Sequence, residues 1–523
     1  MADRGVRDCL AVTVREWRFG GLLRAVRVAR KRRKRERGQA AAGDDSGSCA
    51  VNRHLRTALT APGSSSWLTS CLRRHLPAGF APDPVPFRRA LEGRLADTRK
   101  PRGKRHALTS LVSVAAAGVA AALSGPLPIA QAAGRDQEVL AAHGCWTSPR
   151  TGKRAAPSAS MLDRLPKLLD PDEFEAALTA AVAVLALDPA IPAAYAAHRE
   201  QRRCEQEKKR ESRKRKPPAA AEFREEREDG WVRPHPRHPW LDPAACGDPG
   251  HVPARQGVAV DGKERKGAKA GGGKKAHLLA AVTHAPGIVI AQDRIAKAGK
   301  ANEISHFKPL LAPLPLAGTV VTADAMRANR DNSLFLRAVK DAHWLWPILG
   351  NQPNLNAELN ALDWENTPVA AATGEISRGR IETRTIRVLP APQDTGFEDA
   401  QQALLIERYV TYKKKGQWRT RAESVLYLTS LGPGDTTPED LLAFVRGHWQ
   451  VEHAHWLRDV IWKEDKSLIR TGNGPQVWSA LTNLVITLFR IHGVTSFTEE
   501  TRRIAQDPRR ALQILDLAGL SPG

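Results

Sequence analysis

From residue 256 onward, short apolar segments alternate with longer amphipathic ones, and this pattern strongly limits the folds open to the chain. Strands and helices that alternate in this way predict an α/β domain. Three strands are expected first, then a helix and a buried strand, over residues 258–261, 277–283, 288–292, 302–311 and 319–324. The first and the last of these strands each end in an acid, Asp261 and Asp324.

A helix expected within residues 446–465 carries a third acid. In RGHWQVEHAHWLRDVIWKED, four polar side chains recur at helical spacing and share one face: His448, Glu452, His455 and Asp459. The neighbouring face carries apolar side chains that we expect to anchor the helix in a core: Trp449, Trp456 and Val460. A solvated surface is the simplest alternative for the polar row. A zinc site is disfavoured because the HExxH order is absent.

Such a fold would bring Asp261, Asp324 and Glu452 together. Carboxylate oxygens are hard ligands, and three carboxylates suit a pair of Mg²⁺ or Mn²⁺ ions. Two such ions about 4 Å apart can activate an attacking oxygen and stabilise a leaving oxygen during phosphodiester cleavage. Three antiparallel strands, a helix, a further strand and a late acidic helix follow one another in the order of the ribonuclease H-like fold.

The charge of the chain indicates its partner. Lys and Arg number 80 against 56 Asp and Glu, which gives a net charge of +24 and a pI near 10.2. This excess predicts affinity for a polyanion, because each phosphate that is neutralised releases a counterion. Nucleic acid is therefore the expected partner, ahead of an anionic membrane surface.

Neither the cysteines nor the N-terminal sequence indicates export. The six cysteines are dispersed without a CxxC pair, which favours a reducing compartment, and residues 1–21 lack the apolar core of a signal peptide. The Ala-rich run at 107–123 is shorter than the roughly 20 residues of a membrane span, so we expect a buried helix there. These features predict a cytoplasmic protein without membrane contact.

Composition and periodicity divide the chain into five segments. A basic, poorly ordered extension is expected first, then a small helical domain, a charged and Pro-rich linker, the α/β domain with a β-rich insertion, and a helical tail. The expected boundaries are 1–85, 86–187, 188–250, 251–495 and 496–523, with the insertion at about 370–432.

The chain also resembles a known family, the DDE transposases of bacterial insertion sequences, in the branch that includes the H-repeat-associated proteins. The matching pieces occur in the family's order: PRGKRHALTSLVSV, APSASMLDRL, VAVDGKERKGA, GKANEISHFKPLL, VVTADAM, GNQPNL, RGRIETRTIRV, LYLTSL and RGHWQVEHAHWLRDVIWKED. The resemblance implies Asp261, Asp324 and Glu452 as the DDE triad. It also implies a ribonuclease H-like catalytic core that is interrupted by the β-rich insertion.

The resemblance further implies a mechanism and partners. Such an enzyme binds the inverted-repeat ends of its element on double-stranded DNA and hydrolyses the 3′ ends with two Mg²⁺ or Mn²⁺ ions. It then uses the freed 3′-OH to attack target DNA, working as a homodimer on paired ends. The candidate DNA contacts, each equally compatible with an ordinary surface role, are Lys263, Lys266, Arg380, Arg446 and His448.

Two departures from the family pattern concern the site itself. His453 follows the third acid where the family usually has Asn, and Arg327 follows VVTADAM where the family usually has His. Two alternatives therefore stay open. One is a noncatalytic, DNA-binding remnant of a transposase, and the other is a metal-dependent nuclease of the same fold that cuts without joining.

Overall fold

The computed structural model describes residues 91–92, 94–100, 104–187, 193, 195–197, 199–201, 203–204, 246–269, 275–295, 300–377, 379–414, 417–467 and 469–515. The predicted extension at 1–85 and most of the predicted linker at 188–250 lie outside these residues. All of the described residues belong to one unit, 63–523. The domain boundaries expected from the sequence stay predictions.

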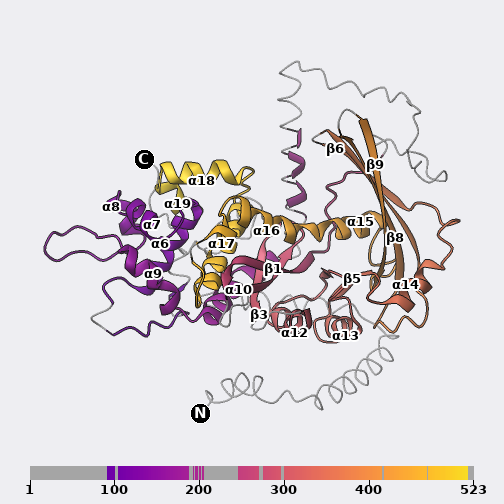
Figure 1. Ribbon diagram of the computed structural model, residues 1–523, viewed down its shortest axis with the longest axis horizontal. Coiled ribbons are helices and arrows are strands. Elements are labelled where there is room, and N and C mark those ends of the chain that lie inside the picture. Colours follow the sequence, from indigo (N-terminus) through magenta and orange to yellow (C-terminus); the bar gives the residue numbers. More distant parts are fainter. Residues whose placement is uncertain are drawn as a thin grey trace, which may run out of the picture. The chain divides into compact units, whose positions relative to one another are not determined.

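Within the described part of the chain, one sheet of nine strands forms the framework, in the order β3-β2-β1-β4-β5-β9-β8-β7-β6 (Figure 1). β1 runs parallel to β4 and β4 parallel to β5, whereas the other neighbouring pairs are antiparallel. The strands are β1 (Gly257–Lys269), β2 (Lys275–Thr283), β3 (Val289–Ile295), β4 (Val320–Ala323), β5 (His343–Ile348), β6 (Ala371–Ser377), β7 (Arg380–Pro390), β8 (Gln402–Lys414) and β9 (Gln417–Thr429).

The prediction that the first strand ends at Asp261 is wrong, because β1 continues to Lys269. Its outer half pairs with β2 as an antiparallel hairpin, through Arg265 opposite Ala276 and Lys269 opposite Lys275. Backbone pairing does not require apolar side chains, so the apolar pattern marked only the buried half of the strand. Asp261 therefore lies inside β1, whereas Asp324 directly follows β4, as predicted.

The predicted β-rich insertion corresponds to β6, β7, β8 and β9, and it continues the main sheet. β9 pairs antiparallel with β5, from Leu345 opposite Thr429 to Ile348 opposite Leu426. The four strands of the insertion then follow as a meander at one end of the sheet.

Two consecutive helices, α15 (Pro438–Gly447) and α16 (Trp449–Val460), cover one face of this sheet. α15 packs over β4, β5, β7 and β8, in a cluster that includes Leu345. α16 packs over β1, β2 and β3, where Val451 and Ala454 meet Ala259. The chain segment that carries Glu452 is thus fixed above the strand that carries Asp261.

The opposite face of the sheet is covered by α12 (Lys300–Leu311) and α13 (Arg330–Ala338), which Figure 1 shows side by side. Alternate residues of a strand point to opposite faces, so Trp346 of β5 points away from α15. Its indole Nε1 donates to Ser333 Oγ of α13 at 2.8 Å, and its ring meets Phe307 of α12 edge-on. α14 (Pro353–Asn360) follows β5.

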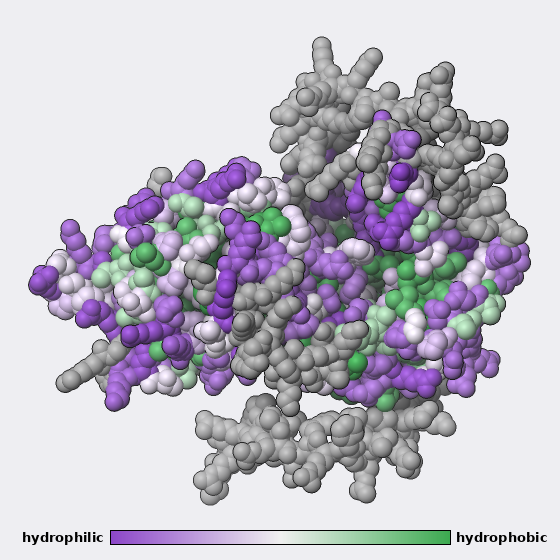
Figure 2. Space-filling view, viewed as in Figure 1, coloured by the Kyte–Doolittle hydropathy of each residue, from purple (hydrophilic) through white to green (hydrophobic). Residues whose placement is uncertain are grey.

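The remaining helices include those expected in the N-terminal helical domain and in the C-terminal tail. They are α6 (Leu108–Ala120), α7 (Pro126–Ala133), α8 (Gln137–Ala142), α9 (Ala159–Leu168), α10 (Pro171–Ala186), η4 (Glu464–Lys466), α17 (Gly474–Ile491), α18 (Phe497–Gln506) and α19 (Arg509–Ile514). α6, in the Ala-rich run, is buried along nearly its whole length and packs against α7, α9 and α17, as the buried-helix prediction required. In the described residues, no helix has the length and apolarity to cross a membrane. The face drawn in Figure 2 is mostly hydrophilic where it is coloured.

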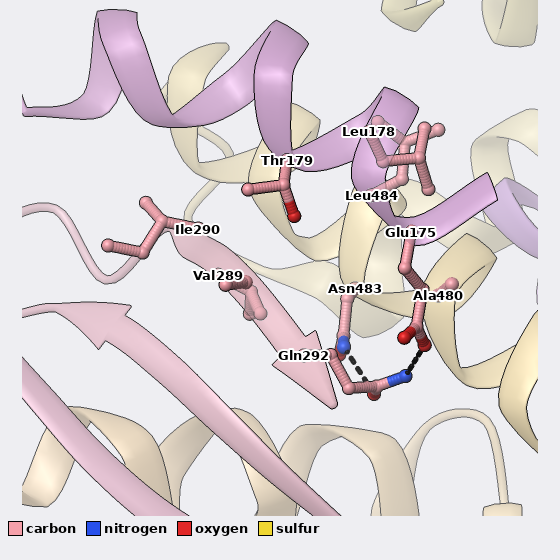
Figure 3. A pocket seen from close by; sticks show the side chains of 10 residues that line it. Glu175, Leu178, Thr179, Val289, Ile290, Gln292, Ala480, Asn483 and Leu484 are labelled. Atoms are coloured by element: carbon pink, nitrogen blue, oxygen red, sulfur yellow. Dashed lines mark hydrogen bonds between the residues drawn. The ribbon is translucent and has the colours of Figure 1, made fainter. Parts of the chain in front are cut away.

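A buried polar cluster joins α10 to β3 and α17, beside a pocket between these elements (Figure 3). Glu175 of α10 accepts hydrogen bonds from Gln292 Nε2 of β3 at 2.5 Å and from Gln476 Nε2 of α17 at 3.0 Å. Asn483 of α17 donates in turn to Gln292 Oε1 at 2.8 Å. Burial raises the pKa of Glu175 to about 8, although the amide hydrogen bonds favour its charged form.

This raised pKa predicts a specific pH dependence of stability. Between pH 4.5, the ordinary pKa of Glu, and about 8, the folded state holds a proton on Glu175 that the unfolded state releases, so the free energy of unfolding falls as pH rises. Glu175→Gln should remove this loss, which amounts to about 1.4 kcal/mol per pH unit within the window. Urea unfolding of parent and variant at pH 5 and at pH 8 measures the difference.

Glu173→Gln, an exposed site on the same helix, is the matched control and should leave the pH profile unchanged. If the free energy of unfolding changes between pH 5 and pH 8 by the same amount in Glu175→Gln as in the parent, then Glu175 is charged in the folded protein and the prediction is wrong.

Candidate active site

The first two predicted acids lie side by side on neighbouring parallel strands. Val260 of β1 is in register with Ala323 of β4, and Asp261 and Asp324 are the residues that follow them. The Asp261 side chain is 25% exposed and the Asp324 side chain 41%. Backbone pairing therefore places the two aspartates on adjacent strands.

A buried arginine connects these two carboxylates. Arg327 Nη1 donates to Asp324 Oδ1 at 2.7 Å and to Asp261 Oδ1 at 3.3 Å, and the arginine side chain is only 1% exposed. The turn after β4 brings it there, since the Arg327 amide donates to the Asp324 carbonyl at 3.1 Å. One cationic nitrogen thus contacts both acids.

The third predicted acid, Glu452, lies much later in the chain, in the helix that packs over β1. Glu452 lies in the first turn of α16, and its negative charge, like that of Asp324, raises the pKa of Asp261. Burial is the larger cause, and the pKa of Asp261 rises to about 6 even though Arg327 favours its charged form. Burial also raises the pKa of Glu452. The helix that carries Glu452 thus packs over the strand that carries Asp261.

The polar face of α16 is turned toward β1, as its helical spacing predicts. His455 Nδ1 lies 3.8 Å from Asp261 Oδ2, and Asp459 Oδ2 accepts from Lys263 Nζ at 2.5 Å. Asp261 and Lys263 lie two and four residues after Ala259, so they point to the same face of β1, which packs against α16.

The C-terminal end of α16 is held by a second, buried ion pair. Arg458 donates to Glu464 through Nε at 2.6 Å and through Nη2 at 2.7 Å, and its Nη2 also reaches Ser479 Oγ of α17 at 2.8 Å. Ser479 donates to Glu464 as well. Glu464 is buried in this pair and so helps to hold the end of α16.

The expectation that the tryptophans of α16 anchor the helix in a core is wrong. Trp449 and Trp456 are 53% and 55% exposed, and Val460 is exposed as well. The buried face is displaced around the helix and comprises Val451, Ala454, Leu457 and Arg458. Arg458 belongs to this buried face because Glu464, its buried partner, neutralises its charge. From the sequence alone, a charged side chain is expected in solvent. On the outer side, Arg408 lies over the Trp449 ring and His453 stacks on Trp456.

The predicted DNA contacts take different positions. Lys263 is buried in its pair with Asp459, Arg446 pairs with Glu375 of β6 at 2.6 Å, and the exposed Arg380 has Glu382 as its partner. The side chain of Lys266 lies outside the described residues. Lys263 therefore positions β1 and α16, and its ammonium group is not presented to solvent.

His448, the remaining predicted contact, lies between α15 and α16 and closes a buried hydrogen-bonded chain. Thr322 Oγ1 of β4 is 3.2 Å from His448 Nδ1 and 2.9 Å from His284 Nε2. Burial lowers the pKa of His448 to about 4 and that of His284 to about 3, so both rings are neutral near pH 7. This chain fixes the N-terminal end of α16 close to Asp324.

Side-chain amides brace the turn that carries Asp324 and Arg327. Asn351 donates to the Ala325 carbonyl at 2.6 Å and Gln352 to the Ala328 carbonyl at 2.6 Å. Both amides belong to GNQPNL, one of the pieces that carries the family resemblance. Asn332 of α13 donates to the carbonyl of Arg327 at 2.8 Å. The turn is thereby held at three backbone carbonyls.

The donor chemistry of the three acids fits a hard divalent cation, because carboxylate oxygens are the ligands that Mg²⁺ and Mn²⁺ prefer. The positions of their side chains, by contrast, do not form a metal site in this structure. Among the described residues, no three acidic, His or Cys side chains are gathered closely enough to hold a metal ion. The guanidinium group of Arg327 lies between the two acids instead.

Sequence reasoning noted Arg327 only as a departure from the family pattern and assigned it no role. Its position three residues after Asp324 was the available signal, since a turn over that span can fold the side chain back onto the acid. No sequence signal singled out Thr322 or His284, because their contacts depend on the packing of α15 and α16 over the sheet.

Comparison with known proteins bears on this site. A family model described as "Transposase DDE domain" matches residues 252–488, a range that contains Asp261, Asp324 and Glu452. A second model, described as "DDE_Tnp_1-associated", matches residues 92–181, the helical region before the sheet.

Individual relatives agree with the family models. The chain is 30% identical over 248 residues to "Putative transposase YncI" of Escherichia coli O157:H7, which covers 45% of this chain and 61% of the relative. It is 27% identical over 289 residues to "H repeat-associated putative transposase YhhI" of Escherichia coli K12, which covers 50% of this chain and 72% of that relative.

The Arg458–Glu464 pair predicts a large stability effect. Arg458→Ala leaves Glu464 buried without its cation and should lower the free energy of unfolding by about 3–5 kcal/mol. Arg503→Ala removes one end of an exposed pair with Glu499 on α18. The buried Glu500, 3.8 Å from Arg503, keeps Arg510 as its partner, so the change should cost less than about 1 kcal/mol. Urea unfolding of both variants makes the comparison, and similar losses in the two would contradict a supporting role for Arg458.

Proposed function

Because the chain belongs to the family of DDE transposases, in its H-repeat-associated branch, we propose that it is a DNA transposase that cleaves the 3′ ends of an insertion sequence and joins them to target DNA. The observation that supports the proposal is that Asp261 and Asp324 lie at matching positions of two adjacent parallel strands, under the helix that carries Glu452. The matched region spans 61% of the YncI relative, so activity, substrate and partners are all part of the proposal.

The strand order supports a ribonuclease H-like core. β1, β2 and β3 form an antiparallel meander, and β1, β4 and β5 run parallel to one another in the order β3-β2-β1-β4-β5. β6 to β9 then extend this core beyond β5. In this proposal the insertion offers a further surface for DNA next to α15.

The roles of the chain's residues follow from their contacts. Asp261, Asp324 and Glu452 are the proposed ligands of two Mg²⁺ or Mn²⁺ ions, which when bound supply charge stabilisation at the scissile phosphate. Lys263 and Arg458 hold α16 so that Glu452 stays above β1. These pairs position the acids and are not proposed to touch DNA.

The proposed DNA partner is double-stranded, at the inverted-repeat ends and at the target, and is bound by a homodimer on paired ends. The net charge of +24 supports this partner because a basic chain gains affinity from the release of counterions. Arg380 of β7, which is exposed, and Arg446 of α15, which is half-buried, are the proposed phosphate contacts among the described residues.

A second candidate function has one observation in its favour. The cationic group of Arg327 already lies between Asp261 and Asp324, as it could in a derivative that binds DNA without cutting it. Such a remnant would keep end binding and would not depend on its acids.

Cleavage and joining test the proposal directly. Duplexes taken from the DNA on each side of the gene are incubated with the full-length protein and Mn²⁺, and the products are resolved on denaturing gels. Asp261→Asn, Asp324→Asn and Glu452→Gln should each lower product formation by about 100-fold or more, because the lost charge acts on the transition state. Binding to the same duplexes should change little.

Glu358→Gln, at an exposed acid on α14, is the matched control and should cleave and join like the parent. Cleavage without joining would favour the nuclease. End binding without any chemistry in the parent would favour the remnant and rule out the enzyme.

A further inference from the structure

The contact between Arg327 and the two aspartates occupies the place that a shared cation would need. Carboxylate oxygens bind Mg²⁺ at about 2.1 Å, which is shorter than either N–O distance from Arg327 Nη1, 2.7 Å to Asp324 and 3.3 Å to Asp261. An ion that bridges these two oxygens on the side where Nη1 lies would therefore overlap that nitrogen. The ion and the nitrogen cannot be there together.

We infer that Arg327 is a built-in competitor for the divalent cation, so that its guanidinium group must leave the space between Asp261 and Asp324 before a metal ion can bridge them. The inference rests on the proposed function, since it concerns the metal ligands proposed there. It predicts that this chain binds divalent cations more weakly than the same chain with a neutral residue at position 327.

Two features of the structure make the competitor persistent. Its backbone is fixed, because Asn332 holds the Arg327 carbonyl while Asn351 and Gln352 hold the carbonyls of Ala325 and Ala328. Its side chain is almost completely enclosed, with 1% of its surface exposed. To leave, the side chain must part from both partners within a turn that cannot easily shift.

The competitor also carries a positive charge, on a planar fork of N–H donors that matches the geometry of carboxylates. Without it, two neighbouring carboxylates and the nearby Glu452 would carry like charges with no internal cation, and their attraction for a divalent ion would rise. One residue thus sets the metal affinity of all three acids.

The experiment measures Mn²⁺ binding to the full-length protein, by the electron paramagnetic resonance signal of free Mn²⁺. Arg327→His, which restores the residue usual in the family, and Arg327→Met, which keeps the length without the charge, should each bind at least tenfold more tightly than the parent. Arg327→Lys keeps the charge and should stay close to the parent. Adding Asp261→Asn to Arg327→His should abolish the gain.

Arg337→Gln is the matched control for charge. Arg337 lies on α13 and pairs with Asp399, away from the three acids, so its loss should leave Mn²⁺ binding unchanged. Thermal unfolding with and without Mn²⁺ gives a second measurement, in which the ion should raise the melting temperature of Arg327→Met more than that of the parent. The variants are used only where circular dichroism matches the parent.

The outcomes separate this inference from the proposed function. If the parent binds Mn²⁺ as tightly as the neutral variants, and Asp261→Asn abolishes that binding, Arg327 does not compete and the triad proposal survives. If neither the parent nor any neutral variant binds Mn²⁺, the inference and the proposed metal ligands both fail. If Arg327→Lys gains as much as Arg327→Met, charge is not the cause and the inference fails.

Discussion

The site depends first on the backbone pairing of β1 with β4, because this pairing forces two carboxylates into adjacent positions. Asp261 and Asp324 follow residues that are in register on parallel strands, so the distance between their backbones is fixed by the sheet. Like charges held together in a partly buried place require a cation nearby. In this structure Arg327 supplies that cation, and its own burial is tolerable because the two carboxylates surround it.

The third acid depends on how α16 is fixed above the sheet. One buried apolar contact surface, Val451 and Ala454 against Ala259, sets the distance between helix and sheet, and polar contacts set the rotation of the helix. Lys263 with Asp459 and Arg458 with Glu464 act near its C-terminal end. Removing either cation would leave a carboxylate without its partner, and breaking a buried pair in this way is strongly destabilising even where the intact pair adds little net stability.

Much of this arrangement was predictable from the sequence, and the failures have physical causes. Apolar runs located β2, β3, β4 and both aspartates, and helical spacing placed Glu452 and His455 on one face. The end of β1 was predicted too early because the hairpin of β1 and β2 continues beyond the last apolar residues of β1. Trp449 and Trp456 were misplaced because Arg458, a charged residue with a buried partner, takes the place that an apolar side chain was expected to fill. Which contacts Arg327 makes could not be predicted, since they depend on β1 and β4 meeting.

The helical region before the sheet is connected to this site through α17. Gln476 and Asn483 of α17 belong to the buried polar cluster around Glu175 of α10. Ser479, which lies between them on α17, bonds to Arg458 and Glu464 at the end of α16. Gln476, Ser479 and Asn483 lie three and four residues apart and therefore occupy one side of the helix. The helical region at 92–181 and the segment that carries Glu452 are therefore joined by hydrogen bonds to the same side of α17.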